Sequence, residues 1–485
     1  MPSVKTNFLY SSILTTANYI FPLLTYPYVS RVLGVEKIGI CNFIDSIINY
    51  FILFSMMGIS ITGIREIAKY KNNQTELNKT FSSLIVLNII STTIMLLILV
   101  AVTYTIPQLY EHKELMYIGG LKLMSNFLLI EWFYKGLEEF KYITKRTLIV
   151  KSIYVLSIFI FIHNPKDYIL YYAILTMMIT INAIINTIHS RKFIEFSINK
   201  ISIKPFVKPF ISLGIYMLLT SMYTSFNIAY LGFVSGATEV GYYTTATKLH
   251  SIILSIFTAF TGVMLPRMSS LIAENKYEDF KNMFYKSVNI LFGLSIPLII
   301  FSIILSPCII YIISGKGYEG AIIPMQIVMP LILIIGYEQI LIIQALMPLK
   351  KDKAILINSM VGAGVGLICN LIFVTSYKSI GSAIVWLISE LTVLCIAQYF
   401  ITKYIRIKFP LILMLKNIIY NIPLGIILYL VNISFSNVHL LKIIVSIIIL
   451  VIYSAIVQLK ILKNPTFNSL LIQATNKFTK LRREQ

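Results

Sequence analysis

Long apolar runs separated by short polar connections recur along the whole 485-residue chain. A helix needs about 20 mostly apolar residues to cross the hydrocarbon core of a membrane. Measured against that length, the runs predict an all-α polytopic membrane protein with about fourteen transmembrane helices. Their approximate limits are residues 8–30, 38–63, 81–105, 115–136, 147–163, 168–189, 208–234, 241–265, 284–313, 321–346, 354–374, 379–401, 411–431 and 438–459.

The composition agrees with this pattern and excludes an ordinary soluble protein. Hydrophobic residues make up 57% of the chain and charged residues 13%, whereas soluble domains average about 45–50% apolar and 25% charged residues. A folded soluble protein needs a polar exterior, so the excess apolar surface must face lipid. No predicted connection is longer than about 20 residues, which leaves no room for a separate soluble domain.

The net charge of +21 would point to nucleic acid in a soluble protein. Here the basic residues gather in alternate connections, which is typical of the cytoplasmic loops of membrane proteins. The alternation predicts a multi-pass protein with both termini in the cytoplasm and no nucleic-acid partner. The basic connections lie around residues 65–79, 141–146, 191–208, 267–281, 350–353 and 403–408, and in the tail 460–483.

The chain contains a weak copy of itself at a shift of about 200 residues. Residues 34–39 (GVEKIG) fall on residues 236–241 (GATEVG). The same register pairs Asn42 with Thr244, Asn49 with Ser251, Arg65 with Arg267, Asn73 with Asn275, Glu76 with Glu278 and Lys79 with Lys281. A slightly larger shift pairs Glu131 with Glu338 and Arg146 with Lys353. The repeated unit holds an even number of predicted spans, so both copies cross the membrane in the same direction.

The repeat predicts two six-helix lobes related by an axis along the membrane normal, followed by two extra C-terminal helices. This architecture is typical of alternating-access carriers, in which two lobes rock about a central site, rather than of a static channel. The predicted domains are an N-lobe (1–200), a C-lobe (201–405), the last two helices (406–460) and a basic cytoplasmic tail (461–485).

Polar side chains follow one face of each of two repeat-related helices. Asn42, Asp45 and Asn49 are spaced i, i+3 and i+7 in the second span, and Thr244, Lys248 and Ser251 follow the same spacing in the eighth. We therefore expect both faces to line a polar substrate-binding cleft. The alternative is that the neutral side chains only join helices through hydrogen bonds, as Ser, Thr and Asn often do in membrane bundles.

Carboxylates inside predicted spans are costly, so each is a candidate functional residue. Glu131, its repeat partner Glu338, and Glu390 are candidates for binding a coupling ion, either H⁺ or Na⁺. The alternative for each is a salt bridge that joins two helices; Lys135, at i+4 from Glu131, offers such a partner. Arg65 and Arg267 begin basic loops and are expected to act as cytoplasmic gate or anchor residues.

The sequence lacks the motifs that are typical of nucleotide binding, metal binding and nucleophilic catalysis. There is no P-loop, no spacing typical of metal ligands, and no nucleophile motif such as G-x-S-x-G. We therefore predict a transporter and not an enzyme, with no catalytic residue, no metal site and no cofactor other than a coupling ion.

The first 150 residues or so resemble bacterial polysaccharide (O-antigen) flippases, of the superfamily that also contains MATE-like multidrug exporters. The resemblance is carried by residues 26–34 (YPYVSRVLG), 63–68 (GIREIA) and 131–138 (EWFYKGLE), and more weakly by residues 240–243 (VGYY). It implies a MATE-like, V-shaped fold in the bacterial cell (inner) membrane. It also implies export of undecaprenyl-diphosphate-linked oligosaccharide repeat units to the outer leaflet for surface polysaccharide biosynthesis.

On that interpretation, Arg31, Lys122 and Lys248 are basic residues that could neutralise the diphosphate of the substrate. The partners would be the lipid-linked oligosaccharide, membrane lipids and other polysaccharide assembly proteins. Two alternatives stay open. One is a cation-coupled exporter of drugs or metabolites on the same fold, which would favour an acidic cleft. The other is a membrane polysaccharide polymerase or acyltransferase, which the short outer loops disfavour.

Overall fold

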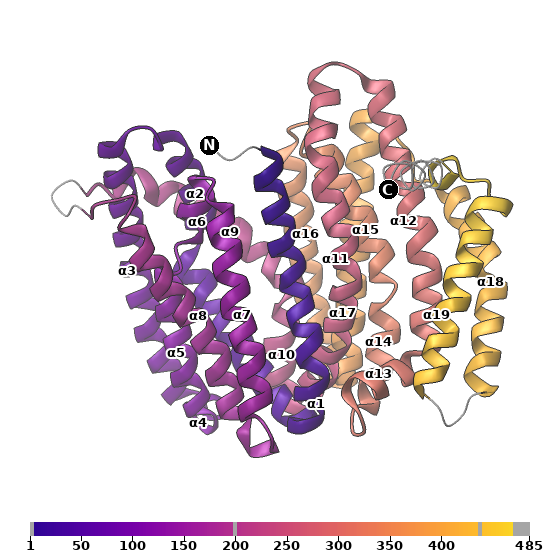
Figure 1. Ribbon diagram of the computed structural model, residues 1–485, viewed down its shortest axis with the longest axis horizontal. Coiled ribbons are helices and arrows are strands. Elements are labelled where there is room, and N and C mark those ends of the chain that lie inside the picture. Colours follow the sequence, from indigo (N-terminus) through magenta and orange to yellow (C-terminus); the bar gives the residue numbers. More distant parts are fainter. Residues whose placement is uncertain (1–3, 197–200, 435–438, 469–485) are drawn as a thin grey trace, which may run out of the picture. The chain divides into compact units, whose positions relative to one another are not determined.

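The computed structural model of the chain describes residues 4–196, 201–434 and 439–468, and every regular element within these ranges is a helix (Figure 1). Helices suit apolar runs in lipid because each one satisfies its own backbone hydrogen bonds. The predicted all-α membrane architecture is therefore confirmed. The last part of the predicted cytoplasmic tail, residues 469–485, lies outside the described residues.

The first part of the chain forms ten α-helices and one short 3₁₀ segment. They are α1 (Val4–Met56), α2 (Ile59–Tyr70), α3 (Gln74–Thr105), α4 (Pro107–Glu111), α5 (Lys113–Leu128), α6 (Glu131–Gly136), α7 (Phe140–Phe161), η1 (Pro165–Asp167), α8 (Tyr168–Ser190), α9 (Lys204–Thr224) and α10 (Phe226–Ser235).

The second part continues in the same manner, with short 3₁₀ or π segments between longer helices. They are α11 (Ala237–Ala273), α12 (Tyr277–Ile304), α13 (Ser306–Ser314), η3 (Glu319–Ala321), α14 (Ile322–Val328), α15 (Leu331–Leu341), η4 (Ile342–Leu346), α16 (Asp352–Cys369), η5 (Asn370–Val374), α17 (Thr375–Ile405), α18 (Leu411–Ser434), α19 (His439–Ile456) and η6 (Val457–Ile461).

Each predicted span falls on helical residues, but the helices do not match the spans one to one. Ten helices among the described residues are long and apolar enough to cross a membrane. Two of these, Ile13–Tyr70 and Asp352–Ile405, are each long enough to contain two of the predicted spans. The count of fourteen stays a prediction.

The positions of the prolines match only some of the helix breaks in the structure. Pro22 and Pro27 both lie inside α1, and the break in that helix comes at Gly34 (φ 76°, ψ 169°). The hydroxyl of Thr25 donates to the Phe21 carbonyl at 3.2 Å, one of the local bonds that accompany the prolines. Pro307 does mark a break, because α13 begins beside it.

The predicted repeat has a close structural counterpart at the starts of its two copies. Gly34 and its repeat partner Gly236 share the same left-handed backbone, with φ of 76° and 85°. Beyond them, a Cβ on Gly39 would clash with the Ala237 carbonyl oxygen, and one on Gly241 would clash with that of Val35. The two crossings are reciprocal, since Val35 and Ala237 are also repeat partners. This reciprocity supports the register read from the sequence.

The contacts divide the chain into two compact units. The first unit contains residues 1–244 and 366–385, and the second contains residues 245–365 and 386–485. In the first unit α1 packs against α3, α5 and α7, and in the second α12 packs against α15, α18 and α19. The division passes through α11, α16 and α17, which contribute residues to both units, whereas the lobes expected from the repeat divide at residue 200. Those lobe boundaries stay a prediction.

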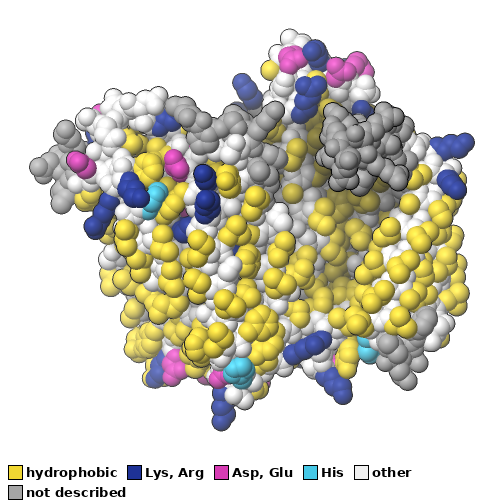
Figure 2. Space-filling model, viewed as in Figure 1, with side chains coloured by type: hydrophobic (Ala, Val, Ile, Leu, Met, Phe, Trp, Pro, Cys, Tyr) yellow, Lys and Arg dark blue, Asp and Glu magenta, His cyan; other side chains and the backbone are white. Residues whose placement is uncertain are grey.

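Large apolar side chains are exposed on the helices of both units. Leu97, Leu371 and Ile412 are 67%, 69% and 72% exposed, which only lipid makes favourable. Hydrophobic side chains cover the middle of the helices on the face shown in Figure 2, and Lys and Arg gather near their ends. This distribution is typical of helices that cross a membrane.

Candidate functional site

The predicted polar face of α1 is present and lines a cavity in the first unit. Asn42, Asp45 and Asn49 lie on this face, beside Ser46 and Tyr50 of the same helix. Leu53 of α1, Ser221 of α9, Ser225 between α9 and α10, and Ile228 of α10 complete the lining. The cavity has a volume of about 180 Å³. Amides and hydroxyl groups therefore face a space large enough for small polar groups.

The carboxylate of Asp45, in the middle of this polar face, is held by three side chains. Lys122 of α5 approaches Asp45 Oδ1 at 2.6 Å and also donates to Asn49 Oδ1 at 2.9 Å. The hydroxyl of Tyr172 donates to Asp45 Oδ1 at 3.1 Å, and Asn49 Nδ2 donates to Oδ2 at 3.0 Å. We call Asp45, Asn49, Lys122 and Tyr172 the neutral cluster, because its one cation and one anion cancel. Lys122 was expected to offer a positive charge to the substrate, and here that charge is already balanced.

Asn42 links α1 to the start of α11. Its side-chain amide donates to the hydroxyl of Thr244 at 3.0 Å, and Thr244 donates to the carbonyl of Val240. The two polar faces were expected to line opposite sides of a cleft, but at this level their repeat-related residues touch. The contact has the character of a helix-to-helix hydrogen bond, the alternative that the sequence left open for neutral side chains.

The other predicted substrate residues lie further along the same helices. Arg31 is exposed on α1, before the Gly34 break. Lys248 is half-buried on α11, and Ser251, one turn further on, is exposed and donates to the carbonyl of Thr247. Thr244 belongs to the first unit, whereas Lys248 and Ser251 belong to the second.

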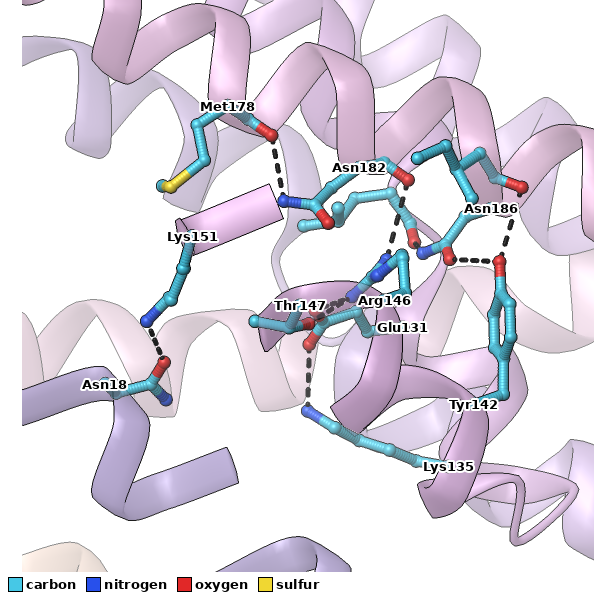
Figure 3. Close-up of polar contacts among 12 residues, drawn as sticks. Asn18, Glu131, Lys135, Tyr142, Arg146, Thr147, Lys151, Met178, Asn182 and Asn186 are labelled. Atoms are coloured by element: carbon cyan, nitrogen blue, oxygen red, sulfur yellow. Dashed lines mark hydrogen bonds and ion pairs between the residues drawn. The ribbon is translucent and has the colours of Figure 1, made fainter. Parts of the chain in front are cut away.

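Glu131, which is half-buried, forms an ion-pair network with Lys135 and Arg146 in the first unit (Figure 3). Its Oε2 lies 3.3 Å from Lys135 Nζ, which confirms the predicted i, i+4 pair. Its Oε1 lies 3.1 Å from Nη2 of Arg146 on α7. Arg146 also donates to the Thr147 hydroxyl at 2.8 Å and approaches the Asn182 carbonyl at 3.5 Å. Arg146 was expected in a basic loop, but it is only 5% exposed.

The helix that carries Glu131 is broken just before it. The span predicted over 115–136 is two helices, because α5 ends at Leu128, Ile130 has a left-handed backbone (φ 36°), and α6 begins at Glu131. Neighbouring side chains of α8 satisfy the carbonyls freed at the break: Thr187 donates to Leu128 at 3.2 Å, and Asn186 donates to Leu129. Broken helices in membranes are tolerated where protein or a cavity satisfies the backbone, and in carriers they often lie near binding sites.

Sequence reasoning missed one charged residue near this network. Lys151 of α7 donates to the side-chain oxygen of Asn18 on α1 at 2.6 Å (Figure 3). It lies inside the predicted span 147–163, so the presence of a lysine within an apolar run was the signal that could have identified it.

The second unit brings Glu338 and Glu390 together. Glu338 of α15 is 9% exposed and Glu390 of α17 is 3% exposed. The Glu338 and Glu390 carboxyl groups lie close enough to interact with each other, and Trp386 Nε1 donates to Glu390 Oε1 at 2.9 Å. Two buried carboxylates side by side repel each other, whereas a proton on one of them lets it donate to the other. Glu338 and Glu390, here called the acid pair, therefore form a candidate proton site inside the second unit.

The predicted gate residues lie near helix ends. Arg65 is exposed on α2, pairs with Glu66 at 3.1 Å, and helps to line a second cavity of about 300 Å³ in the first unit. Lys69, Glu76, Lys79 and Ser202 also line that cavity. Arg267 is exposed on α11 in the second unit. Among the described residues, no three His, Cys, Asp or Glu side chains gather as metal ligands would.

Comparisons with known proteins agree on one family and one fold. Residues 4–272 match the family described as "Polysaccharide biosynthesis protein". Putative O-antigen transporters of Escherichia coli K12 and Shigella dysenteriae are 25% and 27% identical to the chain, over 82% and 80% of its length and nearly all of theirs (97% and 98%). These relatives are named as transporters and not as enzymes.

Among solved structures, the lipid II flippase MurJ in an inward closed conformation superposes with a TM-score of 0.75 at 18% identity, covering 94% of this chain and 99% of its own. An inward-facing multidrug resistance MATE family transporter of the MOP superfamily gives a TM-score of 0.60 at 11% identity, covering 81% of this chain and 98% of its own. At these identities the likeness concerns the fold, and the predicted MATE-like fold is confirmed.

Proposed function

Because the chain belongs to the polysaccharide biosynthesis protein family, we propose that it is a flippase for lipid-linked oligosaccharides. It carries undecaprenyl-diphosphate-linked repeat units from the cytoplasmic to the outer leaflet of the bacterial cell membrane, for surface polysaccharide biosynthesis. The observation that carries the proposal is the family match over more than half of the chain. The names of the two relatives and the fold shared with a lipid II flippase support it.

The polar groups of the first unit suit a substrate with a sugar portion. Undecaprenyl is apolar and can stay in lipid, whereas the sugars need hydrogen-bonding groups while they cross the membrane. The cavity beside the neutral cluster offers amide and hydroxyl groups without excess charge. Neutral hydroxyl-rich sugars suit such a lining, and the ring of Tyr50 adds an apolar face for them.

The proposal includes a topology. Both termini lie in the cytoplasm, and the protein spans the inner membrane many times, because the basic connections alternate along the chain. Reporter fusions after Asn73 and Lys351 are expected to report the cytoplasm, and fusions after Glu111, Glu239 and Lys316 the outer side. An outer-side signal after Lys351 would contradict the topology that the alternating basic connections predict. Other polysaccharide assembly proteins are candidate partners at the membrane.

The acid pair is the best candidate for ion coupling, with H⁺ as the ion. The chain has no ATP-binding motif, so transport runs downhill on the substrate or draws on an ion gradient. Two buried acids in contact are stabilised by one shared proton, and Trp386 donates to Glu390 beside it. Glu131 is less suited to this role, since it is already paired with Arg146 and Lys135.

The acid pair also favours a second candidate function, a cation-coupled exporter of drugs or metabolites. Such an exporter would select cationic substrates through acidic groups. The two candidates differ in what accumulates when the protein is lost. Deletion of a flippase leaves lipid-linked repeat units inside the cell, whereas deletion of a drug exporter raises drug sensitivity.

Deletion in the host bacterium therefore tests the proposal. We expect loss of surface polysaccharide and accumulation of lipid-linked repeat units accessible only from the cytoplasmic side. Complementation with the wild-type chain is the control, and it is expected to restore surface polysaccharide. Normal surface polysaccharide in the deletion strain, with increased sensitivity to cationic drugs, would favour the exporter instead.

A further inference from the structure

The helices around Glu131 carry more positive than negative charge. Lys135, Arg146 and Lys151 contribute three cations, and Glu131 contributes one carboxylate. We call these four residues the basic cluster. Its net charge is +2, in contrast to the neutral cluster, where Lys122 and Asp45 cancel. An unbalanced charge inside a membrane protein is costly unless an anion compensates it.

Lys151 is the cation of this cluster without an anionic partner of its own. In the part of the chain that the structure describes, its ammonium forms no ion pair, and it donates to the neutral amide oxygen of Asn18. Asn18 is exposed, and the ring of Phe21 lies 5.8 Å from the ammonium. An amide oxygen is a weaker partner for an ammonium than a phosphate oxygen, so an incoming anion could replace it.

Arg146 provides a second, independent observation. It is only 5% exposed, yet its Nε has no hydrogen-bond partner among the described residues, although both terminal nitrogens are bonded. A buried guanidinium donor is normally satisfied, because an unpaired one loses its solvation without compensation. The cluster therefore holds an unused donor on Arg146 and an ammonium that lacks a counter-ion.

From this arrangement we propose that the basic cluster binds the diphosphate of the lipid-linked substrate, with Lys151 as its main contact. The proposal rests on the function proposed above and assigns the two parts of the substrate to different places. The diphosphate, with about two negative charges, matches the net charge of the basic cluster. The sugars match the neutral amide-lined cavity. Asn18 holds Lys151 in place while no substrate is bound.

Binding to the purified full-length protein in lipid nanodiscs tests the assignment. The probes are undecaprenyl diphosphate, undecaprenyl monophosphate and phosphatidylglycerol, which separate the substrate diphosphate from a membrane phosphate. For Lys151→Met we expect diphosphate affinity to fall about 10- to 100-fold, because one charge-assisted contact is lost. Lys151→Arg keeps the charge and is expected to retain affinity within about threefold.

Two further variants separate binding from structure. If the bond to Asn18 only joins α1 to α7, Asn18→Ala and Lys151→Met should be equally harmful. If Lys151 binds the anion, Asn18→Ala should keep diphosphate affinity, because the ammonium remains. Lys442 is the matched control: it is 5% exposed and also donates to an amide oxygen, that of Asn432, at 2.9 Å. Lys442→Met is expected to leave diphosphate affinity unchanged.

Three results would overturn the assignment. They are wild-type affinity for the diphosphate in Lys151→Met, equal losses in Asn18→Ala and Lys151→Met, and equal wild-type affinity for phosphatidylglycerol and the diphosphate. The last would make a membrane phospholipid the occupant. If one of these results were found and the wild-type chain still complemented the deletion strain, the flippase function would stand and only the assignment of the diphosphate site would fail. A deletion strain with normal surface polysaccharide would instead reject the function itself.

Discussion

The sequence repeat pairs Glu131 with Glu338, and the two side chains have opposite surroundings. In the first unit, Glu131 lies between Arg146 and Lys135, and its charge is balanced by cations. In the second unit, Glu338 lies beside another buried acid, Glu390, a pairing that a shared proton would stabilise. One of the two acids is thus in an ion pair, and the other faces a second acid. The comparison shows that a repeat can preserve its fold while the chemistry of its buried acids diverges.

The largest expected effect is the loss of stability in Glu131→Gln. The substitution leaves Arg146 buried without a counter-ion, and breaking a buried pair in this way costs about 3–5 kcal/mol. We expect a clear fall in melting temperature and in expression level, measured by thermal unfolding in detergent. As a control, Glu131→Gln combined with Arg146→Gln removes both charges and should recover part of the loss. A melting temperature equal to that of the wild type in the single variant would contradict a stabilising ion pair.

A smaller effect is expected where the two repeats are alike. In Gly39→Ala the new methyl group would meet the backbone of Ala237 and force the crossing apart, at a cost of about 1–3 kcal/mol. The reciprocal variant Gly241→Ala should cost about as much, because its methyl group meets the Val35 carbonyl. Thermal unfolding measures both, with Gly262→Ala as a control that has open space around it. If only one of the two variants lowered the stability, the two reciprocal contacts would not contribute equally to the free energy of unfolding.

The smallest effect on stability is expected for Glu338→Gln. A glutamine side chain imitates a protonated carboxyl group and can still donate to Glu390, so we expect a change below about 1 kcal/mol. The same chemical change is therefore harmful at Glu131 and mild at its repeat partner. Thermal unfolding of both variants in one detergent checks the contrast. A loss at Glu338 as large as that at Glu131 would mean that Glu338 is ionised and paired in the folded protein.

Much of the fold and part of the site could be predicted from the sequence. Lipid demands long apolar helices, so their positions are visible in composition alone. Contacts within one helix follow from its period, which is why the shared face of Asn42 and Asp45 and the Glu131–Lys135 pair were predicted.

Contacts between distant segments could not be predicted, because no local period encodes them. The Lys122–Asp45 pair joins residues 77 positions apart, and Lys151 and Asn18 are 133 positions apart. The break before Glu131 was also missed, because no proline or glycine marks it, and its stability depends on Asn186 and Thr187 of another helix. Tertiary packing decides such features.

The most direct test of the account is flipping of a lipid-linked oligosaccharide in proteoliposomes, with and without an imposed pH gradient. We predict that the wild-type protein flips the substrate above the level of empty liposomes and that the gradient accelerates it. Glu338→Gln is predicted to flip the substrate at a basal rate that does not change with the gradient, because the amide that replaces the carboxyl group cannot take up or release a proton. No flipping by the wild-type protein would contradict the proposed function, and an unchanged gradient response in Glu338→Gln would contradict coupling through the acid pair.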